Sequence, residues 1–155
     1  MMIDPTIPPL EILLRLGLAV LFGMALGLDR ELRGKSAGLR THMLVALGAA
    51  ATTLVALELY SNVMSRYPEG SADPLRAIEG VITAIGFLGA GAIIHGGGQQ
   101  VHGLTSAANI WLCGTVGLAC GGGHYLIAGI TLGFTIVILT VVGFAEGLFH
   151  RKMDD

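Results

Sequence analysis

The chain has 155 residues, of which 53% are hydrophobic and only 13% are charged, and its formal net charge at pH 7 is −2. A soluble domain usually carries about 25% charged residues, and a nucleic-acid binder needs a basic excess, so the composition argues against both classes. Glycine occurs 24 times without a G-X-Y period, which excludes a collagen-like chain. The remaining class is an all-α polytopic membrane protein.

Apolar runs in chain order predict a bundle of five transmembrane helices, because about 20 mainly apolar residues are needed to cross a bilayer. The predicted spans are residues 10–28, 43–60, 77–95, 104–120 and 125–148. We expect residues 1–155 to form a single five-span transmembrane domain, with polar connections between the spans.

Positive charges predict the orientation of this domain. Six Lys and Arg residues lie in the first connection and the C-terminal tail, and two lie in or beside the second connection. Cytoplasmic segments of membrane proteins carry an excess of positive charge, which is the positive-inside rule. We therefore expect the N-terminus outside and the C-terminus in the cytoplasm. The six are Arg30, Arg33, Lys35, Arg40, Arg151 and Lys152, and the two are Arg66 and Arg76.

Glycines at a spacing of four predict close helix packing in the first and fifth spans. The third span is rich in small residues on nearly every face, so we expect it to be the central helix, with Gly86, Gly89 and Gly91 in its contacts. The alternative is that these faces dimerise. The spaced pairs are Gly23 with Gly27, Gly129 with Gly133, and Gly143 with Gly147.

Charged residues near the outer side need partners, because ionisable groups are costly in a bilayer. Arg15 lies one turn from Glu11 and is expected to pair with it, or to face Glu58 or Glu79 inside the bundle. We expect Asp73 to cap the third span. Arg76 is predicted to be buried against Glu11, Glu58 or Glu79. The excess of carboxylates on this side would suit a hydrated Mg²⁺ ion, an alternative to simple solvation.

Polar residues also gather on the predicted cytoplasmic side. The triplet 29–31 (Asp29, Arg30, Glu31) ends the first span, and Arg40 and Thr41 open the second. His102 precedes the fourth span, where Thr105 is a capping hydroxyl and Asn109 is expected to make an interhelical hydrogen bond. No Walker lysine, nucleophile elbow or H-E-x-x-H motif is present, so we expect no enzyme, no metal centre and no bound cofactor.

Five strings in order resemble the MgtC/SapB family of bacterial inner-membrane proteins. They are G-L-D-R-E (27–31), A-G-L-R-T-H-M-L-V-A-L-G-A-A (37–50), D-P-L-R (73–76), I-G-F-L-G-A-G-A-I (85–93) and V-H-G-L-T-S-A-A-N-I-W (101–111). The resemblance covers most of residues 20–125. The motif positions that it implies as a functional set are Asp29, Arg30, Glu31, Arg40, Thr41, Asp73, Arg76, Gly103, Thr105 and Trp111.

The resemblance implies a multi-pass inner-membrane regulator linked to magnesium limitation, virulence or acid stress. It also implies binding to membrane proteins such as the rotary ATP synthase or a P-type ATPase, and we expect a homodimer. The alternative is a transporter or channel for a small ion such as Mg²⁺, formed by an oligomer. Two departures from the family pattern are noted. MgtC-type members carry a soluble domain after the fifth span, which we expect this chain, ending at Asp155, to lack, and His102 stands where the family commonly has Arg or Lys.

Overall fold

The computed structural model describes residues 6–94 and 102–144, and within these ranges it contains helices and no strands. The helices are α1 (Pro9–Leu32), α2 (Leu39–Arg66), α3 (Leu75–Ile94), α4 (Leu104–Gly121) and α5 (Tyr125–Val137), which continues into the π-helical turn η1 (Ile138–Val142). Five of the described helices are long and apolar enough to cross a membrane. The all-α, five-helix prediction is confirmed.

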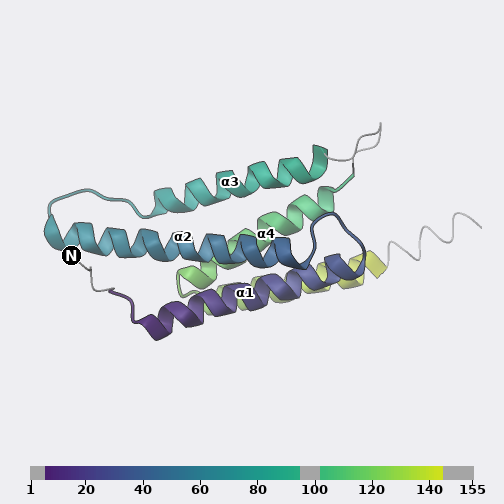
Figure 1. The fold of residues 1–155 in the computed structure, drawn as a ribbon, viewed down its shortest axis with the longest axis horizontal. Coiled ribbons are helices and arrows are strands. Elements are labelled where there is room, and N and C mark those ends of the chain that lie inside the picture. The colour runs from purple at the N-terminus through teal and green to yellow at the C-terminus, as the bar shows by residue number, and fades with distance from the viewer. Residues whose placement is uncertain (1–5, 95–101, 145–155) are drawn as a thin grey trace, which may run out of the picture.

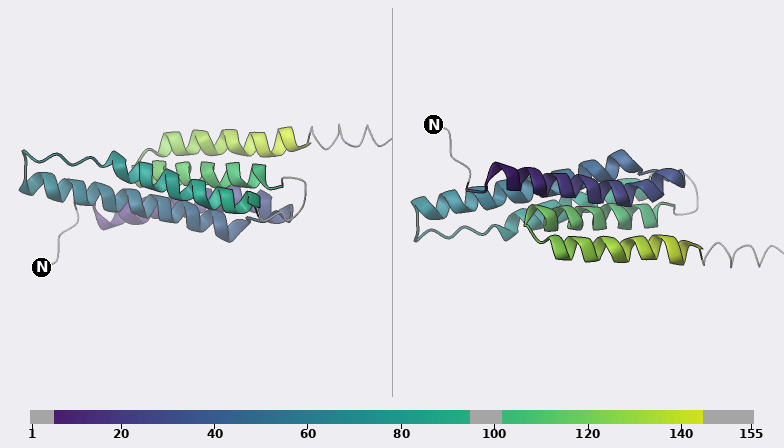
Figure 2. Two further views of the ribbon diagram at one scale, coloured as in Figure 1. Left: turned by 90° about the horizontal axis from the view of Figure 1, so that it is seen from above. Right: turned by 90° about the horizontal axis from the view of Figure 1, so that it is seen from below.

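Successive helices run in opposite directions, and α1, α2 and α4 form a central trio (Figure 1). Figure 2 shows α5 on one edge beside α4, with α1 and α2 on the other side of α4. The trio is lined by small and medium apolar side chains, which leave little space between the helix axes. Its fully buried members include Ala19, Leu26, Ala46, Ala50, Cys113, Val116 and Cys120.

Glycine at two pairs of positions explains why the trio packs so closely. A Cβ built on Gly23 would lie 2.7 Å from the carbonyl oxygen of His42, and one on Gly27 would lie 2.7 Å from the Cα of Leu39. In α4, a Cβ on Gly117 would collide with the Ala46 carbonyl oxygen, and one on Gly121 would lie 2.5 Å from the Ala50 carbonyl oxygen. Both α1 and α4 therefore rest on the backbone of α2, at a distance that only glycine permits.

The central helix is α4, and the prediction that the third span is central is wrong. In their membrane-length windows, 56% of α4 is buried against 11% of α3. Gly89 alone of the three predicted packing glycines meets a neighbour, with its built Cβ 3.6 Å from the Ala107 side chain. Gly86 and Gly91 have nothing within 4 Å. The many small residues of α3 thus lie mostly on an open face.

The connections are shorter than their polar sequence indicates. Asp29–Leu32 belong to α1 and Leu39–His42 to α2, which leaves residues 33–38 between these helices. Before α4, Gly103 adopts φ +87°, in the left-handed region, and a Cβ there would lie 2.7 Å from the Ala92 carbonyl oxygen. Glycine is therefore required where α4 starts beside the end of α3.

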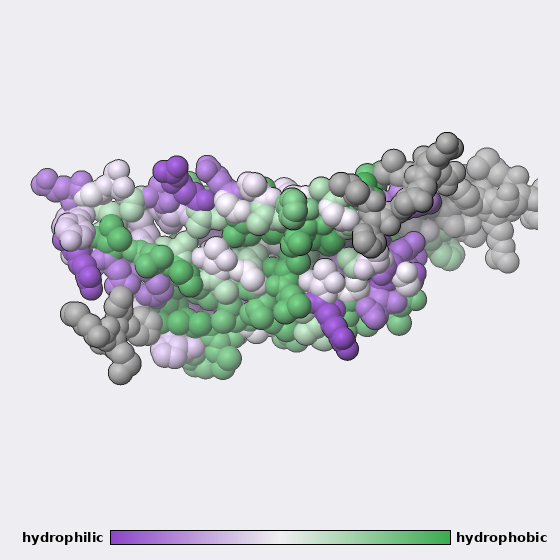
Figure 3. Space-filling model, turned by 45° about the horizontal axis from the view of Figure 1, so that its top comes forward, coloured by the Kyte–Doolittle hydropathy of each residue, from purple (hydrophilic) through white to green (hydrophobic). Residues whose placement is uncertain are grey.

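Polar residues gather toward the two ends, with apolar residues covering much of the middle of the visible face (Figure 3). We call one end the Arg30 end; it contains the end of α1, the start of α2 and the start of α4. The opposite end, where α1 starts and α4 ends, is called the Glu58 end. Each end holds a hydrogen-bonded set of side chains that ties the helices together.

Candidate functional site

Arg30 lies at the last turns of α1 and points at the first turn of α4. It is 4% exposed, and its Nη2 donates a hydrogen bond of 2.6 Å to the hydroxyl oxygen of Ser106. A charged side chain is rarely buried unless it is paired or functional, which makes this residue the start of a candidate site. The motif position Arg30 is thus joined to Ser106 in α4, 76 residues away in sequence.

His42 and Asn109 continue this site one turn deeper. The His42 ring is fully buried, and its Nδ1 lies 2.8 Å from the Gly38 carbonyl oxygen. Because a carbonyl only accepts, Nδ1 carries the proton and Nε2 is free to accept from Asn109 Nδ2 at 3.0 Å. Asn109 also donates to the Leu26 carbonyl oxygen at 3.3 Å. The predicted interhelical hydrogen bond of Asn109 is confirmed, and it links α4 to both α1 and α2.

Cys113 completes the set, which we call the Arg30 cluster: Arg30, His42, Ser106, Asn109 and Cys113. Its thiol donates to the His42 carbonyl oxygen at 3.0 Å. Both cysteines are buried and free, as expected from their sequence separation. The cluster holds the trio together at the Arg30 end through side chains from three helices.

The carboxylates beside the cluster are engaged elsewhere. Asp29 Oδ1 accepts from Arg33 Nε at 2.7 Å, and Glu31 Oε2 accepts from the backbone N–H of Leu39 at 3.0 Å. Glu31 therefore caps α2 from the preceding helix, in the absence of a capping side chain at Gly38. Three buried atoms have no hydrogen-bond partner among the described residues: Asp29 Oδ2, Arg30 Nε and Asn109 Oδ1.

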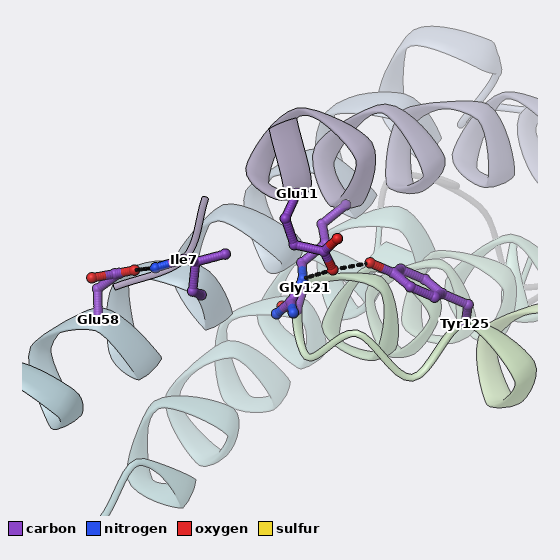
Figure 4. Close-up of polar contacts among 6 residues, drawn as sticks. Ile7, Glu11, Glu58, Gly121 and Tyr125 are labelled. Atoms are coloured by element: carbon purple, nitrogen blue, oxygen red, sulfur yellow. Dashed lines mark hydrogen bonds and ion pairs between the residues drawn. The ribbon is translucent and has the colours of Figure 1, made fainter. Parts of the chain in front are cut away.

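The Glu58 end carries a second set, and its groups are paired. Arg15 Nε donates to Glu11 Oε1 at 2.9 Å, and Nη1 donates to the Gly121 carbonyl oxygen at 2.9 Å. Tyr125 donates to the same Glu11 oxygen at 2.5 Å (Figure 4). The predicted Arg15–Glu11 pair is confirmed, and the alternative pairing of Arg15 with Glu58 or Glu79 is wrong. These contacts tie α1 to the end of α4 and the start of α5.

Glu58 holds the segment before α1 against α2. Its carboxylate accepts from the backbone N–H of Ile7 at 2.6 Å and of Thr6 at 2.9 Å, and Figure 4 shows the bond to Ile7. Backbone N–H groups outside a helix need such acceptors near a membrane surface. The role of Glu58 in this structure is therefore a cap for the start of the described chain.

Arg76 is exposed, and no described carboxylate pairs with it, so the prediction of a buried ion pair is wrong. The physical reason is that α3 packs at the margin of the bundle, so its first turn faces outward. Asp73 does accept from the Leu75 N–H at 2.9 Å, as a cap would. Together with Glu79, Ser71 and Ala72, these residues line an open pocket of about 390 Å³.

The other predicted polar residues stand apart from the buried cluster. Arg40, Thr41, His102, Thr105 and Trp111 are exposed at or near the Arg30 end. Sequence reasoning missed His42, Ser106 and Tyr125 as site residues. The sequence indicated them only weakly as site residues, because His, Ser and Tyr at helix starts are also typical of helix caps and membrane interfaces. No group of three or more His, Cys, Asp or Glu within 6–94 and 102–144 is placed to hold a metal ion.

Comparison with known proteins gives a consistent set of relatives. A family model described as the MgtC family matches residues 16–148. The chain is 38% identical over 135 residues to Protein SapB of Bacillus subtilis (strain 168), covering 87% of this chain and 56% of that protein. It is 38% identical over 131 residues to the "Putative magnesium transporter YhiD" of Escherichia coli (strain K12), covering 84% and 60%.

A third relative is Protein MgtC of Brucella abortus (strain 2308), with 38% identity over 120 residues, 77% of this chain and 46% of that protein. The chain therefore spans less than two thirds of the length of the curated relatives that it matches. No solved structure matches the chain.

Proposed function

The chain belongs to the MgtC family of membrane proteins, and on this premise we propose that it is a regulator that acts by binding other membrane proteins. We place it in the inner membrane of a bacterium, as a multi-pass protein without catalytic activity. The magnesium-related name of a relative supports a link to magnesium supply.

The observation that carries this proposal is the apolar layer between the two polar ends. Ala46, Ala50, Val116 and Cys120 are fully buried against one another and against Ala19 of α1. An ion crossing the bundle would have to leave its water in this layer, where the described side chains offer it no charged partner. A packed apolar layer is therefore better suited to a binding scaffold than to a path for ions.

Partner binding is supported by the open faces of the outer helices. Gly80, Gly86 and Gly91 in α3, and Gly129 and Gly133 in α5, have nothing within 4 Å. Small residues let a helix of another protein approach closely in a bilayer. We propose a second copy of the chain, a rotary ATP synthase or a P-type ATPase as the partners.

The charges of the two ends support an orientation with the N-terminus outside and the C-terminus in the cytoplasm. Arg30, Arg33, Lys35 and Arg40 lie at the Arg30 end, whereas Arg66 and Arg76 lie at the Glu58 end. The positive-inside rule then puts the Arg30 cluster on the cytoplasmic side.

Transport of a small ion such as Mg²⁺ is the second candidate, favoured by the name of the Escherichia coli relative. Mg²⁺ would then be the cargo, and an oligomer would have to supply the path that one copy closes. The carboxylates of Asp73 and Glu79 beside the open pocket are the oxygen ligands that such a cargo would meet first.

A flux measurement separates the two candidates. The purified chain is reconstituted into liposomes that contain a magnesium-sensitive dye, and Mg²⁺ entry is compared with that into empty liposomes. A regulator gives equal rates, including at high protein density where oligomers form. Entry that rises with protein density and falls when Asp73 and Glu79 are both changed to neutral residues would establish transport instead.

A further inference from the structure

At the Arg30 end, Arg30 is a buried cation that no described carboxylate contacts within ion-pair distance. The ion pairs of the described chain are Arg15–Glu11 and Arg33–Asp29, and neither includes Arg30. Its guanidinium makes one hydrogen bond, to Ser106, while its buried Nε has no acceptor among the described residues. Removing a guanidinium from water is costly unless an anion or a set of acceptors compensates it. Arg30 is therefore positioned to bind an anionic group.

The helix that Arg30 touches offers further donors at the same place. The first bond within α4 runs from the Ala107 N–H to the Gly103 carbonyl oxygen at 2.9 Å. The N–H groups of Leu104, Thr105 and Ser106 precede it, and no side chain caps them. The hydroxyl of Ser106 accepts from Arg30, so its own proton remains available to donate. Such a helix start attracts anions through its N–H groups and its partial positive charge.

We propose that the Arg30 end binds a phosphate group, held by Arg30, the Ser106 hydroxyl and the free N–H groups at the start of α4. The site is distinct from the apolar faces that we propose for partner proteins. Exposed Arg33, Lys35 and Arg40 lie at the same end and raise the local concentration of anions. The neighbouring carboxylates oppose this attraction weakly, because Asp29 is paired with Arg33 and Glu31 caps α2.

An unpaired acceptor beside Arg30 defines the ligand further. Asp29 Oδ2, on the residue before Arg30, is buried and lacks a donor among the described residues, so a ligand that carries a hydroxyl as well as phosphate oxygens could supply one. Two sources share this chemistry: the headgroup of phosphatidylglycerol, which sits at the membrane surface, and hydrogen phosphate from the cytoplasm. The experiment has one arm for each.

In the lipid arm, native mass spectrometry measures binding of phosphatidylglycerol and phosphatidylcholine to the purified chain in detergent. We expect Arg30→Gln to weaken phosphatidylglycerol binding by about tenfold or more, the loss typical of a charge-assisted hydrogen bond. Arg66→Gln removes an equal charge from an exposed position at the Glu58 end, away from the proposed site, and should leave the binding close to that of the unmodified chain. Phosphatidylcholine has a quaternary ammonium in place of the hydroxyls and should bind more weakly.

In the phosphate arm, thermal unfolding is followed in sodium phosphate and in sodium chloride at equal ionic strength. A phosphate-specific rise in the melting temperature that Arg30→Gln abolishes would assign the site to free phosphate, and binding of phosphatidylglycerol alone would assign it to the lipid. If Arg30→Gln does not fold, Ser106→Ala replaces it, since that change removes one hydroxyl and keeps the charge. The proposal is overturned if neither ligand depends on Arg30 or Ser106, or if Arg66→Gln loses as much binding as Arg30→Gln.

Discussion

Glycines four residues apart occur in both α1 and α5, yet the two pairs have different surroundings. Gly23 and Gly27 lie against the backbone of α2, whereas Gly129 and Gly133 have nothing within 4 Å. The same contrast separates α4, whose Gly117 and Gly121 press on α2, from α3, whose Gly86 and Gly91 are open. A glycine pair therefore marks a helix capable of close approach, and the rest of the fold decides whether the approach occurs within the chain or with another protein.

The side-chain hydrogen bonds also differ between the trio and α3. The trio α1, α2 and α4 is joined by buried side-chain hydrogen bonds at the Arg30 end, such as Asn109 to His42. α3 contributes no side-chain hydrogen bond to another helix within the described residues. We infer a firm frame made of the trio, with α3 attached mainly through packing on α4.

Gly117→Leu should unfold the frame or reduce its stability the most. A Cβ at this position would collide with the Ala46 carbonyl oxygen, so α4 must move away from α2. Overpacking typically costs about 1–3 kcal/mol, and a backbone collision lies at or above the top of that range. Thermal unfolding in detergent measures the loss. Gly86→Leu, on the open face of α3, is the matched control and should melt like the unmodified chain.

Asn109→Ala should reduce stability by about 1–3 kcal/mol, because the Leu26 carbonyl oxygen and His42 Nε2 would lose their donor in a buried place. Thr115→Ala, on the same helix, removes a hydroxyl that bonds only within α4 and serves as the control. Equal unfolding curves for the two variants would mean that the buried network does not join the frame.

Tyr125→Phe tests how firmly α5 is held at the Glu58 end. The change removes the hydroxyl that donates to Glu11 and keeps the ring, so we expect a smaller loss than for Asn109→Ala. Differential scanning fluorimetry is sensitive enough for this comparison. A loss as large as that of Asn109→Ala would place α5 within the frame.

Arg76→Ala should leave the stability within about 0.5 kcal/mol of the unmodified chain, because the side chain is exposed and makes no ion pair with a described carboxylate. The same melting experiment applies. A marked loss of stability would support the buried ion pair that the sequence predicts. It would also mean that α3 packs more tightly than it does in the structure.

Hydropathy was enough to predict the helices, because crossing a bilayer demands long apolar runs that no other element supplies. Local pairs were predictable too: Glu11 and Arg15 lie one turn apart, and a helix brings such residues together whatever the fold. The order of the helices around the centre was not predictable. α3 and α4 have similar small residues, and membrane helices show small side chains to lipid, to each other and to partners alike.

The Arg30 cluster was predictable only in part. The family strings singled out Arg30 and Thr105, but the residue that meets Arg30 is Ser106, and which of two neighbouring hydroxyls points inward depends on the rotation of α4. That rotation is set by Gly117 and Gly121 against α2, a contact between segments about 70 residues apart. The prediction of a buried ion pair for Arg76 was wrong for the same reason. The surroundings of Arg76 depend on the position of α3 in the bundle and not on the local sequence.

The division between frame and open faces is tested most directly by photocrosslinking in the living cell. A photoreactive phenylalanine analogue is placed at Phe87 of α3 or Phe134 of α5, both strongly exposed, and at Leu21 of α1 as a lipid-facing comparison. We expect discrete protein adducts from α3 or α5, identified by mass spectrometry as a second copy or another membrane protein, and none from Leu21. Adducts from Leu21 alone, or none from any position, would contradict it.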